Sequence, residues 1–488
     1  MFLPLMASFA STQDTIYVMG SGQVLYRKAI TEIDSITFEN SLIKRISIAD
    51  KMSTDSRYTI FYQGLVATGL VDSLKPDRDK KYNYYQYRSL LNPPFTQGSG
   101  SVDELPGLRR FGFTVFMESD SIFRLNSITN LSGLKTYAAT VYNAVYPGDA
   151  GITDLTNRRN SLNRFIAYHI INKKLSQNKL IDAYDTDHMI KTVDMYEYLE
   201  PICPNSLIEI KKERSSGLTN LINQSTDTGN AIHIIKNFDA PDIFNGFYYG
   251  IDKIMSFDLS VLKSLSAKRL RFDMAALFPE LTNNNMRASG KVQSWIIPKT
   301  YIKGITSSES TVVDYLNSFG GYLDYQGDEI FFKGVYDFSI VTLPIPAGTY
   351  EVRFGYTGTN GRGIAEVYVD SVSAGPPVDF RINGSNPEIG YIKPGADPTD
   401  PYGYENDKMM RNHGYMKGPD SFRDFINRWY GLNTARNYEN YLRRILGTYT
   451  FTTTGNHKIS IKGLMQGQFM IDFIEFVPVS TLESEDIH

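Results

Sequence analysis

The sequence has very little cysteine: Cys203, in the stretch EPICPNS, is the only one among 488 residues. A single cysteine excludes an intramolecular disulfide framework and any zinc cluster built on cysteine ligands. Its position between isoleucine and proline is more typical of a small buried hydrophobe than of a nucleophile. The charges nearly balance, with 50 Lys and Arg against 53 Asp and Glu. No global field would attract nucleic acid, so we expect no nucleic-acid partner.

The sequence also lacks the common motifs of catalysis and cofactor binding. It contains no H-E-x-x-H, G-x-S-x-G, P-loop or dinucleotide fingerprint. Gly20 and Gly22 in GSGQ are followed by no helix start and no phosphate-binding lysine, so they predict a hairpin turn. We therefore expect no cofactor and no enzymatic activity. A carboxylate pair for glycoside hydrolysis stays open as an alternative, because such pairs meet in space without a fixed sequence spacing.

What the chain does have is length and aromatic residues. A chain of 488 residues exceeds one hydrophobic core, and about 150 residues per domain would give roughly three units. The 33 Tyr and 28 Phe favour β-structure. No stretch after the N-terminus approaches the roughly 20 consecutive apolar residues of a membrane span. We expect two substantial domains joined by smaller pieces.

The N-terminus resembles the late part of a secretory signal. Residues 1–13 begin with the apolar MFLPLMASFA, which ends in a cleavage-like SFA before Ser11. No basic segment precedes it, so we expect the native gene to begin upstream, with a lipid-accepting cysteine before Asp14. This predicts export to the outer membrane or cell surface, with a lipid anchor as the only membrane contact. A frayed apolar N-terminus is the alternative. Residues 14–45 are predicted to be β-rich.

Residues 162–170 form one apolar face of a predicted helix. Leu162, Phe165, Ile166, His169 and Ile170 recur at i, i+3, i+4, i+7 and i+8. A catalytic histidine needs a nucleophile or acid partner, and no serine or cysteine motif lies nearby. The spacing therefore predicts a buried, structural imidazole that is hydrogen-bonded to a backbone carbonyl.

Four stretches within residues 46–258 resemble, in order, the motifs of a fasciclin domain: STDSRYTIFYQGLVATGLVDSL, FTVFMESDSIF, NSLNRFIAYHII and DIFNGFYYGIDKIM. They include the family's Tyr-His pair at Tyr168 and His169, for which the resemblance implies a structural role. Two positions depart from the family. Its Ala-Pro-Thr is replaced by 117–119 (Met-Glu-Ser), and a frequent closing histidine is replaced by Tyr249.

The C-terminal part is predicted to be a β-sandwich. Residues 259–310 read as a connector, and the signature from 311 to 488 is β. Alternating residues predict strands at 350–356 and 364–369 across a hairpin loop, TGTNGRG. The last strands, ending in DFIEFVP, resemble galactose-binding-like jelly rolls, the fold of many carbohydrate-binding modules. An insertion at 383–446 is rich in Pro, Gly and Asp at first and is predicted to be helical afterwards.

Aromatic side chains in the expected loops are the first candidates for ligand or partner contact, because flat rings stack on sugars and anchor interfaces. Local packing of the loops is the alternative for these rings. Polar residues of the loop TGTNGRG could also bond sugar hydroxyls. The candidate binding residues are Trp429, Tyr430, Tyr82, Tyr84, Tyr85, Tyr87, Asn360 and Arg362. Four acidic residues could offer calcium ligands but lack the EF-hand order, and a solvated acidic loop is the alternative. They are Asp397, Asp400, Glu405 and Asp407.

Together these patterns predict an α+β protein, a fasciclin-like domain followed by an all-β jelly-roll sandwich with a partly helical insertion. Such a combination resembles accessory lipoproteins of bacterial outer-membrane complexes that import glycans or peptides. The resemblance implies a non-enzymatic surface binding protein, with a transporter or other surface lipoproteins as partners and a glycan as a further ligand. A matrix-type adhesin and a polysaccharide-degrading enzyme are the competing hypotheses.

Overall fold

The structure is a mixed α and β protein with several antiparallel sheets. The computed structural model describes residues 15–20, 23–29, 46–83, 105–176, 180, 190–192, 196–212, 220–223, 231–235, 243–287, 293–317, 328–420, 422–424 and 434–481. The chain divides into two compact units, Met1–Arg45 and Ile46–His488. In the first unit, β1 (Thr15–Gly20) and β2 (Gln23–Ala29) pair antiparallel on either side of the predicted turn.

The second unit begins with a half in which helices surround short sheets, residues 46–266, called the mixed half below. Its helices are α1 (Ile48–Ser53), α2 (Thr59–Ala67), α4 (Asp120–Leu125), α5 (Leu131–Val145), α6 (Ser161–Tyr168) and α7 (Leu259–Ser266). Several begin at a side-chain cap. Ser119 accepts from the Ile122 amide before α4, and Asn160 accepts from the Leu162 amide before α6. Each such cap contributes about 1 kcal/mol.

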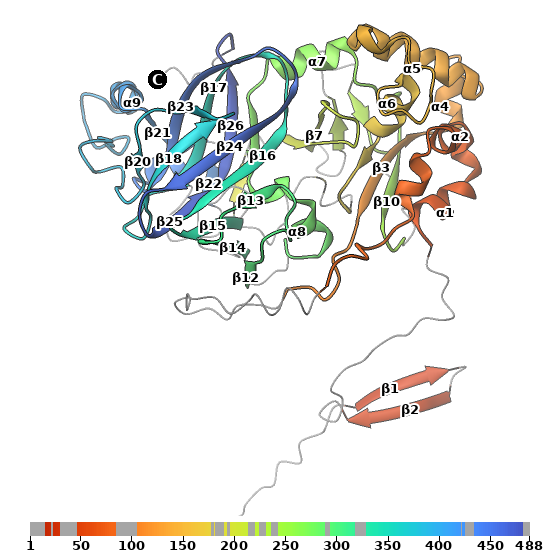
Figure 1. Ribbon diagram of the computed structural model, residues 1–488, viewed down its shortest axis with the longest axis horizontal. Coiled ribbons are helices and arrows are strands. Elements are labelled where there is room, and N and C mark those ends of the chain that lie inside the picture. Colours follow the sequence, from red (N-terminus) through yellow and green to blue (C-terminus); the bar gives the residue numbers. More distant parts are fainter. Residues whose placement is uncertain are drawn as a thin grey trace, which may run out of the picture. The chain divides into compact units, whose positions relative to one another are not determined.

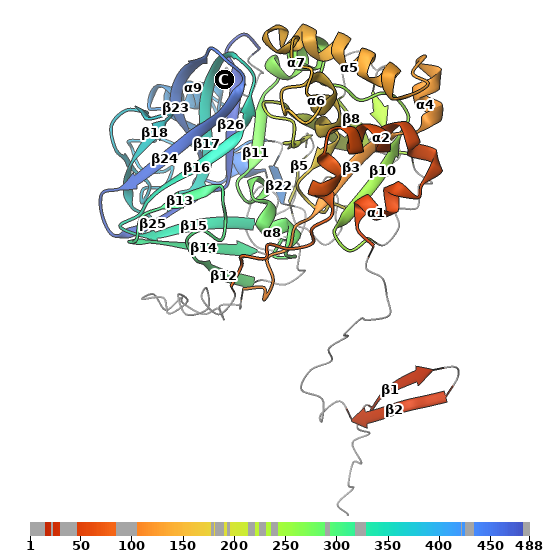
Figure 2. The same cartoon turned by 45° about the vertical axis from the view of Figure 1, so that its right-hand side comes forward.

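The mixed half also contains a three-stranded and a four-stranded sheet. One has the order β10 (Gly246–Ile251), β3 (Phe113–Glu118) and β4 (Ile170–Ile171), and β3 runs parallel to β10. The other has the order β6 (Tyr196–Leu199), β7 (Ile208–Lys212), β8 (Asn220–Ile222) and β9 (Ile232–His233). Figures 1 and 2 both show α1 and α2 against β3 and β10. The Ile48 amide fixes α1 there by donating to Asn245 Oδ1 at 2.9 Å.

The rest of the unit is a sandwich half, residues 270–481, built on three sheets. The first has the order β11 (Leu270–Asp273), β26 (Phe473–Pro478), β17 (Gly348–Thr357), β23 (Tyr441–Phe451) and β21 (Tyr415–Lys417). The second has the order β13 (Ile305–Ser307), β16 (Asp337–Ile345), β24 (Gly455–Gly463), β18 (Ile364–Val369) and β19 (Val372–Ser373), and β20 (Val378–Asp379) also pairs with β18. The third has the order β12 (Gln293–Ile297), β14 (Thr311–Asn317), β15 (Asp328–Gly334) and β25 (Gly467–Ile471).

The sandwich half extends beyond the predicted boundary at residue 311. β11, β12 and β13 all lie within 259–310, and they pair with β26, β14 and β16. The short helix α8 (Pro279–Asn283) also lies in this stretch. We predicted a connector because strands of three to five residues between turns show little alternation of apolar and polar residues. The structure identifies them as strands by their pairing at the edges of the sheets.

The strands at 350–356 and 364–369 exist, but the predicted hairpin between them does not. β17 lies in the first sheet of the sandwich half and β18 in the second, so the loop 358–363 crosses between sheets. Both strands turn alternate apolar residues into one core. Alternation alone cannot distinguish partners within a sheet from partners across a sandwich.

The insertion at 383–446 contains a helix in the part predicted to be turn-rich, and the described residues of the part predicted to be helical include two strands. The helix is α9 (Tyr404–Asn412), in the turn-rich part. Downstream, β22 (Phe422–Asp424) pairs with β5 (Ile190–Thr192), and residues 441–446 belong to β23. β23 pairs with β17 over its whole length, and this tertiary pairing overrides the local helical spacing.

No helix among the described residues combines the length and the apolar character needed to cross a bilayer.

Candidate functional site

A polar hollow of about 670 Å³ opens among the loops of the sandwich half. Three separate segments form it: the β17–β18 loop, the end of β20 with the chain after it, and the residue that precedes β23. We call it the amide hollow, because four asparagines line it. Its lining residues are Gly358, Thr359, Asn360, Asp379, Arg381, Ile382, Asn383, Asn386 and Asn440.

Backbone hydrogen bonds hold the three segments together. The Gly358 amide donates to the Asn440 carbonyl at 2.9 Å, and the Gly384 amide donates to the Glu439 carbonyl at 2.7 Å. The approach is so close that a Cβ at Gly358 would lie 2.4 Å from the Ile382 carbonyl oxygen. Glycine is therefore needed where the first two loops meet.

One ion pair fixes the charge on the wall of the amide hollow. Arg381 Nε and Nη2 donate to the two oxygens of Asp379 at 2.8 and 2.6 Å, and the Arg381 amide adds a third bond at 2.9 Å. These bonds from Arg381 hold the pKa of Asp379 below its usual value. The Asp379 carboxylate therefore stays ionised at neutral pH and can accept hydrogen bonds. The guanidinium group of Arg381 beside it is a hydrogen-bond donor.

The amides of the hollow differ in how far they are engaged. Asn383 accepts from the Ser385 hydroxyl at 2.7 Å, and Asn386 accepts from the Glu388 amide at 2.9 Å. Asn360 and Asn440 are exposed, and their side chains bond to no other residue in the part of the chain that the structure describes. An amide both donates and accepts, so such a wall suits ligands with many hydroxyl groups.

Of the two polar residues predicted in the loop TGTNGRG, only Asn360 lines the amide hollow. Arg362 is 7% exposed, its Nε donates to the Thr357 carbonyl at 2.9 Å, and its guanidinium lies 5.2 Å from the Phe331 ring centre. Arg362 therefore anchors the loop to the sheet instead of presenting a donor to a ligand.

The predicted aromatic residues fall mostly outside the described residues. Tyr82 is described and is packed: its hydroxyl donates to the Pro106 carbonyl at 2.8 Å, and its ring lies edge-on to Tyr301. It contributes to local packing, which was the alternative weighed for these rings. The other predicted rings lie beyond the described ranges; they are Tyr84, Tyr85, Tyr87, Trp429 and Tyr430.

The acidic residues considered for calcium do not converge. Asp397 and Asp400 accept bonds from neighbouring backbone amides, and Glu405 pairs with Lys408. Asp407 is buried and pairs with Lys417 at 2.9 Å and with Arg436. Within the described ranges, no group of three or more acidic, histidine or cysteine side chains is arranged to hold a metal ion. The calcium hypothesis fails because each carboxylate is used locally.

Tyr168 and His169 are both fully buried, as the helical spacing predicts for His169. His169 Nδ1 bonds to the Phe165 carbonyl at 2.7 Å, and Nε2 bonds to Glu118 Oε1 at 2.9 Å. The same Glu118 oxygen accepts from the Met255 amide at 2.7 Å. Glu118 is one of the residues 117–119, at which this stretch differs from the fasciclin motif that it resembles. It gives the buried imidazole an acidic partner on β3.

A second cavity, of about 470 Å³, lies where the mixed half meets the sandwich half. Two carboxylates line it, Glu200 after β6 and Glu280 in α8. Burial raises the pKa of Glu200, against a hydrogen bond from Asn456. Glu280 Oε2 is buried and accepts no bond from the described residues. The two carboxylates of this junction cleft lie in different surroundings. Carboxylates whose surroundings differ can serve as the acid and the base of one reaction.

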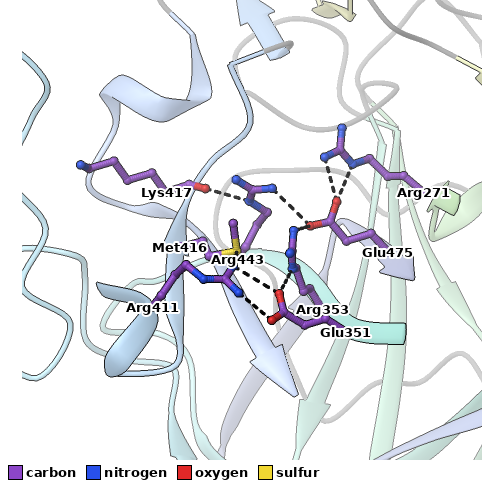
Figure 3. Close-up of polar contacts among 8 residues, drawn as sticks. All are labelled: Arg271, Glu351, Arg353, Arg411, Met416, Lys417, Arg443 and Glu475. Atoms are coloured by element: carbon purple, nitrogen blue, oxygen red, sulfur yellow. Dashed lines mark hydrogen bonds and ion pairs between the residues drawn. The ribbon is translucent and has the colours of Figure 1, made fainter. Parts of the chain in front are cut away.

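A network of buried charges lies on the first sandwich sheet (Figure 3). Glu475 accepts from Arg271 at 2.9 Å, from Arg443 at 3.3 Å and from Arg353 at 3.4 Å. These residues come from four of the five strands. Arg353 also pairs with Glu351, which Arg411 reaches from α9 at 2.7 Å. The network ties strands and helix together, and we assign it a structural role.

Sequence reasoning missed most of the amide hollow. Asn383 and Asn386 lie in NGSN, which reads as a turn, and Asp379, Arg381 and Asn440 carry no motif. Asparagine-rich turns were the available signal. The segments near residues 360, 383 and 440 meet because strands that are distant in the sequence pair with one another. One sequence does not display these pairings.

No family model matches the chain, and no curated protein matches it. Among solved structures, the chain is similar to a FAS1 domain pair from the insect cell adhesion molecule Fasciclin I, with 12% identity and a TM-score of 0.26 over 44% of this chain and 52% of that one. It is similar to a Paenibacillus xanthan lyase, with 11% identity and a TM-score of 0.24 over 64% of this chain and 27% of that one. It is also similar to an exo-β-1,3-galactanase from Phanerochaete chrysosporium, with 8% identity and a TM-score of 0.18 over 55% of this chain and 41% of that one. The chain thus spans about half, or less, of the length of each.

Proposed function

We propose that this chain is a non-enzymatic cell-surface binding protein that holds a glycan in the amide hollow. The observation that supports the proposal is the convergence of four asparagines and the Asp379–Arg381 pair on one open surface. Amides, a carboxylate and a guanidinium together match the alternating donors and acceptors of sugar hydroxyls. Loops carried on a rigid sheet scaffold are a common place for recognition.

The proposed setting is an accessory subunit of an outer-membrane complex that takes up glycans or peptides. In this setting the N-terminus carries a lipid anchor, and the partners are a transporter or other surface lipoproteins. Pull-down of the full chain from its native membrane distinguishes this setting from a matrix adhesin. An uptake subunit copurifies with a transporter, whereas an adhesin does not.

Glycan binding is tested with the full chain on an array of oligosaccharides. We expect binding to at least one glycan class, and loss of it in the double variant Asn360→Ala/Asn440→Ala. Each lost hydrogen bond contributes about 1 kcal/mol, so the double variant is expected to bind roughly 10- to 30-fold more weakly. Because both side chains are exposed and make no other bond among the described residues, folding should be unaffected.

The matched control is Asn412→Ala, which removes an exposed asparagine at the end of α9, outside the hollow. It should bind as the unchanged protein does. Equal binding by the double variant and by the unchanged protein would remove the hollow as the site, and binding to no glycan would contradict the function.

A polysaccharide-degrading enzyme is the second candidate, and the junction cleft is the observation that favours it. Glu200, with its raised pKa, would act as the general acid, and Glu280 would act as the second carboxylate. Turnover of polysaccharides by the unchanged protein, abolished in Glu200→Gln and Glu280→Gln alike, would establish this activity. We expect no turnover, as a binding protein predicts.

A further inference from the structure

A separate cavity of about 380 Å³ lies in the mixed half, between the end of α4, strand β7 and helix α7. Figure 1 shows α7 beside β7. We call it the Glu209 pocket after the carboxylate that β7 contributes. It shares no lining residue with the amide hollow. Its apolar lining, called the apolar wall below, includes Ile122, Leu125, Ile254 and Val261.

The Glu209 side chain is buried in this pocket, with 2% of its surface exposed. Its Oε2 lies 2.7 Å from Lys268 Nζ, but its Oε1 is buried and accepts no hydrogen bond from the described residues. Burial raises the pKa of Glu209, and the charge of Lys268 opposes the rise. Buried carboxylate oxygens normally accept a hydrogen bond. Glu209 Oε1 is therefore an acceptor to which a ligand could donate.

A second polar atom of the pocket is in the same condition. Ser264 Oγ on α7 is buried and has no hydrogen-bond partner within the described ranges. Two further carboxylates line the pocket. Asp252 pairs with His233 at 2.8 Å, and Asp258 caps α7 by accepting from the Val261 amide at 2.9 Å. The pocket is therefore rich in acceptors; Lys253 also lines it and donates to the Ala231 carbonyl at 2.9 Å.

The apolar wall is incompletely covered. Leu125 is 81% exposed although it borders the cavity. An apolar group of a ligand that rests on Leu125 and Ile122 would remove this surface from water. The pocket volume is at the lower end of the range for small-molecule sites.

We propose that the Glu209 pocket binds a small molecule that carries a protonated primary amine on a short apolar chain. An ammonium group has three donors and no acceptor, so it suits a pocket whose unpartnered buried atoms, Glu209 Oε1 and Ser264 Oγ, are both oxygens. An anionic head group would face Glu209, Asp252 and Asp258 and is disfavoured. A hydroxyl group supplies only one donor. The chain of the ligand lies along the apolar wall. This site does not depend on glycan binding at the amide hollow.

Three probes with the same six-carbon chain test the proposal on the full-length protein: hexylamine, hexanol and hexanoate. Binding is measured by calorimetry at neutral pH. We expect hexylamine to bind at least about tenfold more tightly than hexanol, since charge-assisted hydrogen bonds are about twice as strong as neutral ones, and hexanoate to bind weakest. Equal binding of the three probes, or no binding of hexylamine, would overturn the proposal.

Two variants locate the site. Glu209→Gln removes the charge, and Ser264→Leu fills the pocket from α7 without touching the Glu209–Lys268 pair. Both should weaken hexylamine binding by about tenfold or more. Glu388→Gln, an exposed glutamate of the sandwich half, is the control. Circular dichroism checks that each variant is folded, and Ser264→Leu decides the matter should Glu209→Gln fail to fold. Unchanged binding in a folded Ser264→Leu variant refutes the site.

Discussion

At the scale of single residues, the buried His169 is the feature that the sequence pointed to most directly, and Glu118 is its partner in the structure. Nδ1 is used by the Phe165 carbonyl, so the imidazole has only Nε2 left for Glu118. Both side chains have no exposed surface. An imidazole closed in this way cannot act on a ligand from solvent, and its contribution is to stability.

The change His169→Ala should lower the free energy of unfolding by about 3 kcal/mol or more, because it leaves a cavity and a buried carboxylate with one partner fewer. Urea denaturation measures the loss. His233→Ala is the control, since that imidazole is 38% exposed in its pair with Asp252 and should contribute less than about 1 kcal/mol. Equal losses from the two changes would show that burial is not what matters.

The double variant Glu118→Gln/His169→Ala should lose less stability than the sum of the two single variants. Once the imidazole is gone, the neutral amide is better tolerated than the buried carboxylate. A strictly additive result from the same urea measurements would mean that the two side chains do not act as a pair.

The spacing of four apolar residues around His169 was enough to place it inward. Local signals of this kind act within one turn of helix, so one sequence displays them. The acidic partner Glu118 was not predicted, because it lies 51 residues away on β3. Long-range partners follow from the fold.

At the scale of elements, Glu475 binds strands β11, β17 and β23 to β26. Burial by itself would raise the pKa of Glu475, but the guanidinium groups of Arg271, Arg443 and Arg353 outweigh it and hold the pKa well below the usual 4.5. A depressed pKa means that the ionised form stabilises the folded state. This contribution is complete above the unfolded pKa and is lost as the pH falls towards the folded pKa.

Glu475→Gln should therefore destabilise the protein by about 3–5 kcal/mol at neutral pH, because the buried guanidinium groups lose their shared carboxylate. The difference in the free energy of unfolding between the variant and the unchanged protein should become smaller below about pH 4.5. In that range Glu475 of the unfolded chain binds a proton, and folding must release it. Denaturation at several pH values measures this. A difference that stays constant from pH 7 to pH 3 would contradict the proposed role.

The loops of the amide hollow depend on Gly358. In Gly358→Ala the new methyl group would meet the Ile382 carbonyl oxygen, so the first two loops must separate. We expect a loss of stability of about 1–3 kcal/mol and weaker glycan binding, both measured on the same sample. The control is Gly375→Ala in another loop. Gly375 has a positive φ and open space around it, so this change adds backbone strain without a steric contact. Comparing the two variants therefore separates the effect of the contact at Gly358 from that of backbone strain.

The elements themselves were only partly predictable. Residues 441–446 of β23 fall in the part of the insertion that the sequence predicts to be helical, and the pairing of β23 with β17 decides otherwise. In the same way, alternation revealed β17 and β18 but not that they face each other across a core. The sequence thus indicated strands more reliably than it indicated their partners.

At the scale of the whole molecule, the sandwich half includes strands that precede residue 311. β11 is the edge of the first sheet, and Trp295 of β12 stacks on Tyr315 of β14 at 5.5 Å. A fragment that starts at 311 would lose β11, β12 and β13 and expose three sheet edges. Fragments 259–488 and 311–488 should therefore differ: the longer one is soluble and unfolds cooperatively, and the shorter one aggregates. Equal behaviour in thermal unfolding would place the boundary at 311.

The central claim, that the amide hollow holds a glycan, is tested most directly by hydrogen exchange of the full chain with and without a glycan selected on the array. We predict slower exchange at residues 358–360, 379–386 and 440, with unchanged exchange in the mixed half. These segments meet only at the hollow, so their joint protection would identify it. Protection confined to residues 46–266, or to any surface away from these loops, would contradict the account.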